Sequence, residues 1–291
     1  MNPEVLIIGC GFLGEAAAEL FSARGKRVLG LVRSNASLGT LSGRHFEVGT
    51  CDVTDSESLT SLTPRLGGVP LAIYAVSAGS GGAETYASVY REGLRRIIDH
   101  WNPGRVIFVS STSVYGQDDG SWITEESPAS PERETGRILL EAEAIALAAG
   151  GSVARLSGIY GPGRSMLLGK FLAGEAVLEN GGHRWMNQIH RDDGAASLLA
   201  MADPSTPAGI YNVSDDVPVT QRELYGWMAR FLNRPLPPEG PLDLNRKRGV
   251  TSKRVSNRKL HGIGWVPAYP SYRDALPQLT SASGIGSSEF C

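Results

Sequence analysis

The chain has 291 residues, with 28 lysines and arginines against 30 aspartates and glutamates, and 41% of its residues are hydrophobic. This length suffices for one large core or two smaller ones. A net charge of −2 gives no reason to expect nucleic acid or an anionic membrane as a partner. No apolar run approaches the about 20 residues of a membrane span, and no secretory signal pattern opens the chain. Three scattered cysteines argue against a disulfide framework or a metal site, so we expect a reduced cytoplasmic protein.

Short apolar runs alternate with longer helical patterns through most of the chain. Continuous apolar strands between amphipathic helices are typical of a parallel sheet covered on both faces. The sequence therefore predicts an α/β fold, a doubly wound parallel sheet of about seven strands. The expected strands are Val5–Gly9, Val28–Val32, His45–Val48, Leu71–Val76, Val106–Ser110, Val153–Leu156 and Ile210–Val213. The expected helices are Glu15–Arg24, Ser56–Thr63, Tyr86–Trp101, Glu132–Ala149, Arg191–Met201 and Thr220–Leu232.

The alternation becomes irregular, and glycine and proline become denser, after the sixth expected strand. We expect residues 1–155 to form a nucleotide-binding domain to which residues 187–213 return. Residues 156–186 and 214–280 are expected to form a smaller, interleaved C-terminal α/β lobe that binds substrate. The segment 281–291 is rich in serine and glycine, which predicts a disordered tail.

A glycine-rich turn follows the first expected strand. Gly9 permits a tight turn, Gly11 lets the backbone approach a pyrophosphate, and Gly14 lets the next helix lie close to the strand. The backbone at Phe12 and Leu13 then opens that helix, whose free N–H groups and positive dipole end suit phosphates. We therefore expect a dinucleotide at this turn, the alternative being a turn with a structural role alone.

The end of the second expected strand indicates which dinucleotide. An acidic side chain there would accept hydrogen bonds from the adenosine ribose, whereas this chain has Arg33 and Ser34. A guanidinium and a hydroxyl suit a 2′-phosphate, so we expect NADP(H), with NAD(H) less favoured. The alternative is an ordinary solvated arginine.

Four further motifs occur in order along the chain: Cys51–Asp55 (CDVTD), Ser110–Gly116 (SSTSVYG), Arg155–Gly163 (RLSGIYGPG) and Asn187–Asp193 (NQIHRDD). With the glycine turn, they give the sequence a resemblance to the extended short-chain dehydrogenase/reductase superfamily. Within it the chain is similar to the NAD(P)-dependent epimerase/dehydratase group and its atypical YeeZ-like branch. The resemblance extends over about Met1–Leu279 and implies a Rossmann fold.

The resemblance also implies positions for the cofactor and an assembly. A homodimer would form through the helices expected at Tyr86–Trp101 and Glu132–Ala149. The implied cofactor residues are Asp52 and Val53 at the adenine, Ala75, Val76 and Ser77 along the ribose, and Ser157 and Gly158 beside the nicotinamide.

One departure from the family pattern concerns its chemistry. The family normally uses a Tyr-x-x-x-Lys pair, in which the lysine lowers the pKa of a phenol that shuttles a proton during hydride transfer. Aligning Glu143 with the acid that often follows the pair places Thr135 and Leu139 at the tyrosine and the lysine. None of the five lysines has a tyrosine four residues before it.

Other groups could then act at the reaction centre. The motif places Ser111 where the family has its substrate-orienting hydroxyl, and Tyr115 is a candidate catalytic acid. Glu125, Glu126 and His190 are further candidates for a proton route, and His190 also for a substrate contact. Each has a plainer alternative: a packing tyrosine, solvated glutamates, and a histidine that caps the following helix.

The segment from Leu244 to Arg273 has no acidic residue and several basic ones. Arginine side chains such as Arg254 suit a phosphate or carboxylate on a substrate, so we expect Arg254 to contact one. Nucleic acid is not expected, because Asn245–Lys259 has no aromatic residue. The alternative is a solvated loop.

We therefore expect an NADP(H)-binding oxidoreductase-like protein that acts on a small polar carbonyl, alcohol or sugar-like substrate. Since the Tyr-x-x-x-Lys pair is missing, a non-catalytic NADP(H) sensor or scaffold is the main alternative. An epimerase or dehydratase of nucleotide sugars is a third hypothesis, which depends even more on the absent tyrosine.

Overall fold

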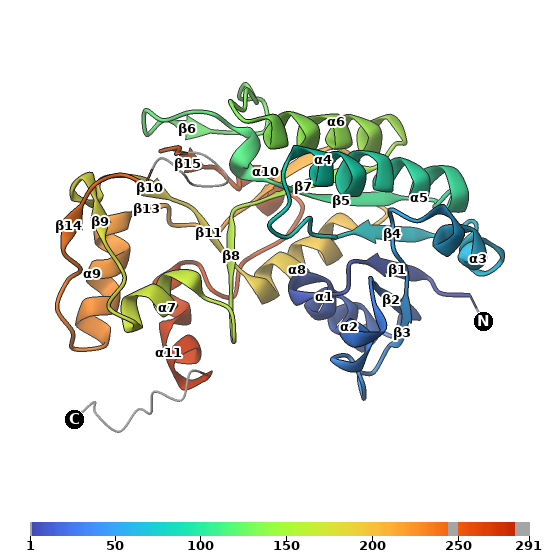
Figure 1. The fold of residues 1–291 in the computed structure, drawn as a ribbon, viewed down its shortest axis with the longest axis horizontal. Coiled ribbons are helices and arrows are strands. Elements are labelled where there is room, and N and C mark those ends of the chain that lie inside the picture. The colour runs from blue at the N-terminus through green and yellow to red at the C-terminus, as the bar shows by residue number, and fades with distance from the viewer. Residues whose placement is uncertain (1, 244–249, 283–291) are drawn as a thin grey trace.

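The computed structural model describes residues 2–243 and 250–282, and its centre is a seven-stranded sheet (Figure 1). The strand order is β12-β7-β5-β4-β1-β2-β3, and every neighbouring pair is parallel, so the predicted doubly wound sheet is confirmed. The basic residues 246–248 lie outside the described residues, as do residues 283–291 of the tail predicted at 281–291, while Ser281 and Ala282 belong to the last helix. The strands are β1 (Val5–Ile8), β2 (Val28–Val32), β3 (Glu47–Thr50), β4 (Leu71–Tyr74), β5 (Val106–Ser111), β7 (Ser152–Leu156) and β12 (Ile210–Val213).

Helices cover both faces of the sheet, because successive side chains of a strand point to opposite faces. In β1, Leu6 and Ile8 join one apolar core while Val5 and Ile7 join the other. Figure 1 shows α4, α5 and α6 above the sheet and α1 and α8 below it. The first face carries α3 (Ser56–Leu66), α4 (Ala83–Tyr86), η1 (Ala87–Glu92), α5 (Gly93–Trp101) and α6 (Glu134–Ala148). The second carries α1 (Phe12–Ala23), α2 (Asn35–Gly39), α8 (Arg191–Met201) and α10 (Arg258–His261).

Most elements differ from their predicted bounds by one to three residues, and two of these differences have a structural reason. The third strand is Glu47–Thr50, two residues later than expected, because this edge strand is exposed or half-buried and carries little apolar signal. The helix expected at Tyr86–Trp101 starts earlier, as α4, and contains the π-helical turns of η1 before α5. Such π-helical turns frequently lie at functional sites.

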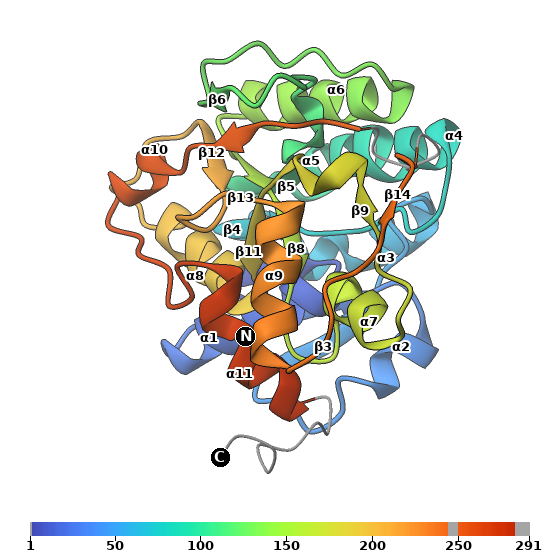
Figure 2. The same cartoon turned by 90° about the vertical axis from the view of Figure 1, so that its left-hand side faces the viewer.

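A third apolar core lies beside the sheet, between residues 160 and 279. Its helices bury Leu168, Leu224, Met228 and Leu276, and Figure 2 shows α9 and α11 at the front of this lobe. The helices of the lobe are α7 (Met166–Leu172), α9 (Gln221–Phe231) and α11 (Tyr272–Ala282). Its short strands and turn are β9 (Leu178–Glu179), η3 (Asn180–Gly182), β10 (Trp185–Met186), β13 (Val219–Thr220) and β14 (Glu239–Gly240).

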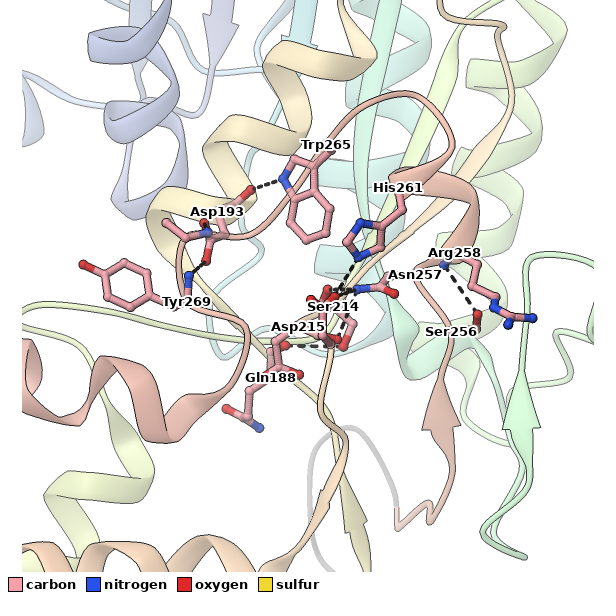
Figure 3. Close-up of polar contacts among 12 residues, drawn as sticks. Gln188, Asp193, Ser214, Asp215, Ser256, Asn257, Arg258, His261, Trp265 and Tyr269 are labelled. Atoms are coloured by element: carbon pink, nitrogen blue, oxygen red, sulfur yellow. Dashed lines mark hydrogen bonds and ion pairs between the residues drawn. The ribbon is translucent and has the colours of Figure 1, made fainter.

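Polar contacts connect the C-terminal segment to the sheet side of the molecule (Figure 3). The carboxylate of Asp193 on α8 accepts the backbone N–H groups of Ala268 and Tyr269, at 2.7 and 2.9 Å. The indole of Trp265 donates to the Asp193 carbonyl, and the Asn257 amide donates to carbonyls of the loop after β12. Two parallel strand pairs add to this connection, β8 (Gly158–Tyr160) with β11 (Gln188–His190) and β6 (Trp122–Ile123) with β15 (Arg254–Val255). Each helix of the described residues is too short or too polar to cross a bilayer.

An ion pair is buried between the sheet and α6. The Arg155 Nε lies 3.0 and 3.1 Å from the two carboxylate oxygens of Glu143, and both side chains are almost fully buried. The Ser110 hydroxyl donates to the same carboxylate at 2.6 Å. This pairing satisfies two charges that would otherwise be very costly to bury.

We predict that Glu143→Ala lowers the free energy of unfolding by about 3–5 kcal/mol, because it leaves the Arg155 guanidinium buried without a partner. Urea denaturation followed by tryptophan fluorescence measures this. The matched control is Glu141→Ala on the same helix, which breaks an exposed pair with Arg91 and should leave stability close to that of the wild type. Equal losses of unfolding free energy in the two variants would contradict a special role of the buried Arg155–Glu143 pair.

Candidate functional site

A cleft of about 420 Å³ opens at the carboxyl ends of β1, β2, β4, β5 and β7. This is the edge at which doubly wound sheets bind ligands, and the volume lies in the range of roughly 300–1,000 Å³ of ligand sites. Ten of the predicted cofactor and catalytic residues line it: Gly9, Gly11, Phe12, Leu13, Arg33, Ala75, Val76, Ser77, Ser111 and Ser157.

The three glycines of the turn have different surroundings. Gly9 has a φ of +88°, and a Cβ there would lie 2.6 Å from the Val76 backbone. A Cβ on Gly14 would lie 2.4 Å from the Gly9 carbonyl oxygen, so only glycine permits this approach of α1 to β1. A Cβ on Gly11 would meet nothing within 4 Å, and this residue faces the cleft. Gly9 and Gly14 therefore build the turn, and Gly11 leaves room for a ligand.

The first turn of α1 presents hydrogen-bond donors to the cleft. Its N-cap, Gly11, has no side chain that could cap the helix. In the part of the chain that the structure describes, the amides of Phe12 and Leu13 have no acceptor. Burial raises the pKa of the neighbouring Cys10 thiol to about 12, so no thiolate forms beside them. Free amides and the positive end of the helix dipole together favour an anion here.

A cation and hydroxyls lie at the end of β2. Arg33 is exposed and lines the cleft, and no carboxylate of the described residues lies within ion-pair distance of it. Ser34 caps α2 by accepting the Ser37 N–H at 3.4 Å, and its hydroxyl lies 3.2 Å from that of Ser37. Ser37 and Thr40 line the cleft beside Arg33. One exposed guanidinium and several hydroxyls therefore lie together at this end of the cleft.

Hydroxyls and apolar side chains lie where β5 and β7 end. The Ser111 oxygen accepts the backbone N–H of Ser113 in η2 (Thr112–Val114), at 3.2 Å, which leaves the Ser111 hydroxyl proton free to be donated. The Ser157 hydroxyl is buried at the cleft wall without a hydrogen-bond partner among the described residues. Leu139 of α6 also lines the cleft. A buried hydroxyl without a partner is unfavourable unless a ligand or water completes it.

The other predicted acid–base groups, Tyr115, Glu125 and Glu126, do not line the cleft. Tyr115 is buried, its hydroxyl donates to Asn212 at 2.9 Å, and burial raises its pKa. Burial also raises the pKa of Glu125, which accepts the Asn212 N–H. Glu126 is exposed and accepts from a threonine, and its pKa is lowered by that bond.

The predicted substrate contacts also lie apart from the lining residues. His190 is fully buried, caps α8 through Nδ1, and has a pKa that burial lowers, so it is neutral at pH 7. The Arg254 guanidinium stacks between Trp122 and Trp185, at 5.3 and 4.9 Å from the ring centroids. Lys253 is buried, and its Nζ donates to the Tyr115 carbonyl at 2.8 Å.

Five of the predicted cofactor residues do not line the cleft. Asp52 closes its own turn by accepting from the amide and hydroxyl of Thr54, at 2.9 and 2.7 Å. Val53 is buried in the first core. The other three, Gly14, Ser34 and Gly158, have the structural positions given above on α1, α2 and β8.

Some lining residues were not singled out from the sequence. Tyr86 and Tyr90 lie one helical turn apart on α4 and η1, and Arg164 follows the glycine-proline-glycine turn after β8. The spacing of the two tyrosines is also typical of an ordinary buried helix face. The turn after β8 belongs to the Arg155–Gly163 motif, but nothing in the sequence shows that it lies against the start of α1.

The comparisons with known proteins agree with this geometry. The model of the NAD dependent epimerase/dehydratase family matches residues 5–214. The chain belongs to this family. Protein YeeZ of Escherichia coli (strain K12) is 32% identical over 282 residues, which is 92% of this chain and 96% of the relative.

Solved structures have the same fold. A structure described as an NAD-dependent epimerase/dehydratase from Methylobacillus flagellatus has a TM-score of 0.80 and 31% identity, and the match covers 98% of this chain and all of the other. MoeE5 in complex with UDP-glucose and NAD has a TM-score of 0.78 at 20% identity, over 96% of this chain and 98% of that one. The second likeness is one of fold.

We predict opposite effects from alanine at two glycines of the turn. Gly14→Ala should lower stability by about 1–3 kcal/mol, because its Cβ would collide with the Gly9 carbonyl. Gly11→Ala should keep the wild-type unfolding curve, because its Cβ has no atom within 4 Å. It should nevertheless lower the affinity for any ligand that binds against this backbone. Thermal unfolding and ligand titration of both variants test this, and a stable Gly14→Ala protein would refute the close approach.

Proposed function

We propose that the protein binds NADP(H) in the cleft and transfers hydride to or from a small polar carbonyl or alcohol compound. The observation that carries the proposal is the glycine turn, whose unengaged amides at Phe12 and Leu13 face the cleft at the carboxyl edge of the sheet. The name of the family and the NAD bound to MoeE5 support a nicotinamide nucleotide. The buried Ser157 hydroxyl, which has no partner among the described residues, fits a polar ligand at the other end.

NADP(H) is favoured over NAD(H) by the charges at the end of β2. Arg33 and Ser37 line this part of the cleft, and no lining residue is acidic. A guanidinium can bind a 2′-phosphate through two parallel hydrogen bonds, whereas NAD(H) has an uncharged hydroxyl at the same position of its ribose. The Ser34 and Ser37 hydroxyls add donors beside it.

Ser111 orients the substrate in this proposal. Its oxygen is already hydrogen-bonded by the Ser113 N–H, so its own proton can be donated to a carbonyl oxygen. When bound, the nicotinamide supplies or accepts the hydride. In this proposal the substrate lies between the sheet and the lobe, next to Ser111 and Ser157 at the ends of the paired strands β5 and β7.

A proton donor is also required, and the lining phenols are the groups that can provide it. The Tyr90 oxygen accepts the backbone N–H of Ala78 at 3.2 Å, and such a bond stabilises a phenolate. Tyr86 lies against Tyr90, with ring centroids 5.0 Å apart. Leu139 occupies the wall where a cation would assist the phenol, so we expect slow turnover. This apolar wall is what favours the second candidate function, a non-catalytic NADP(H) sensor.

We predict that the wild-type protein binds NADPH more tightly than NADH and that Arg33→Asp reverses this preference. The variant loses a charge-assisted contact and repels the 2′-phosphate, so its affinity for NADPH should fall by about tenfold or more. Calorimetric titration with both nucleotides measures this. Arg273→Asp, an equal charge change at an exposed position of α11, is the control. An unchanged preference in Arg33→Asp would refute the role of the arginine.

A screen of NADPH oxidation against aldehydes, ketones and keto-sugars separates an enzyme from a sensor. We expect turnover with at least one carbonyl class, reduced by about 10²-fold in Ser111→Ala because a donor to the developing oxyanion is lost. Tyr90→Phe should reduce the rate while NADPH still binds. Tight NADPH binding without any turnover would favour the sensor.

A further inference from the structure

A short turn on the lobe side of the molecule contributes Arg164 to the cleft that the glycine turn also lines. Gly161 and Arg164 exchange two backbone hydrogen bonds of 3.0 Å, with Pro162 second in the turn and Gly163 third, at a φ of +73°. Proline and a positive-φ glycine at these positions define a type II turn. Ser165 then caps α7 by accepting the Leu168 N–H. The backbone that carries the Arg164 side chain is therefore fixed from both sides.

This turn lies directly against the start of α1. A Cβ on Gly161 would come within 3.3 Å of the Phe12 ring, so glycine is what lets the two segments approach. The Arg164 guanidinium carbon lies 5.1 Å from the centroid of the same ring, and Arg164 and Phe12 both line the cleft. Stacking of this kind holds a guanidinium in place without neutralising its charge.

Two arginines share the Phe12 ring but differ in their charge partners. Arg191 on α8 lies 5.3 Å from the ring centroid, and its Nε donates to the Asp192 carboxylate at 2.9 Å. Arg164 is exposed, and within the described residues no carboxylate comes within ion-pair distance of it. The Arg164 guanidinium thus lines the same cleft as Phe12 and Leu13, whose amides have no acceptor among the described residues.

We propose that Arg164 binds the pyrophosphate of the dinucleotide from the side opposite the glycine turn. The inference rests on the proposed function, since it assigns a further residue to the same cofactor site. A guanidinium fork matches two phosphate oxygens, and the helix amides hold the other side of the group. Because Arg164 comes from the segment between β8 and α7, the bound cofactor also ties this segment to α1.

The test is calorimetric titration of Arg164→Gln and of its matched control, Arg191→Gln, with two probes. NADPH contains the pyrophosphate, whereas adenosine 2′-monophosphate has the 2′-phosphate and no pyrophosphate. We expect Arg164→Gln to lower the affinity for NADPH by about tenfold and to leave the affinity for adenosine 2′-monophosphate unchanged. Arg191→Gln should alter neither affinity by more than about twofold, since its charge is already paired. Thermal unfolding of both variants shows that they are folded.

Three results would overturn the inference: wild-type affinity of Arg164→Gln for NADPH, equal weakening of both probes, or the same loss in Arg191→Gln. Equal weakening would mean that the arginine acts on the adenosine end or through its general positive potential. If the wild-type protein binds neither NADPH nor NADH, the proposed function itself fails and the role of Arg164 fails with it. If the wild type binds and Arg164→Gln is unaffected, only the role of Arg164 fails.

Discussion

The close approach of α1 to the end of β1 determines what the cleft can bind. Gly14 lies so near the Gly9 carbonyl that a single added carbon would force the helix away from the strand. The apolar side of the same helix, with Ala17 and Phe21, is buried against the sheet, so the helix cannot tilt to relieve such a collision. Its first turn consequently points unengaged amides at one fixed place, and the proposed phosphate binding depends on this constraint.

The fold and one end of the site could be predicted because their signals are local. Strands buried on both faces give continuous apolar runs, and a glycine turn between a strand and a helix can be recognised within about ten consecutive residues. The direction in which a side chain beside such a motif points is set by residues far away in the sequence, so it could not be predicted. The Tyr115 hydroxyl meets Asn212, a residue 97 positions later, and no spacing within the Ser110–Gly116 motif indicates that partner.

The same reasoning explains why Arg164 and the two cleft tyrosines could not be found from the sequence. Their positions depend on how distant segments pack: η1 lies against α6, and the turn after β8 lies against α1. Arg254 is a related case. Its place in a basic segment predicts a ligand contact, which stays a prediction, and the segment could not show that its guanidinium lies between Trp122 and Trp185. Charge along a sequence does not reveal which side chains surround each charge.

Helix α6 combines two features with opposite consequences for chemistry. Glu143 keeps a buried ion pair and holds Ser110 at the cleft wall, so the frame beneath the site is rigid. One turn earlier, Leu139 gives the same wall an apolar surface. The Tyr90 phenol accepts the Ala78 N–H, which carries only a partial charge, and Leu139 stands where the family alignment expects a lysine ammonium. Under the proposed function, this combination favours nucleotide binding over rapid proton transfer, and we expect substrates whose carbonyl oxygen needs little protonation in the transition state to react fastest.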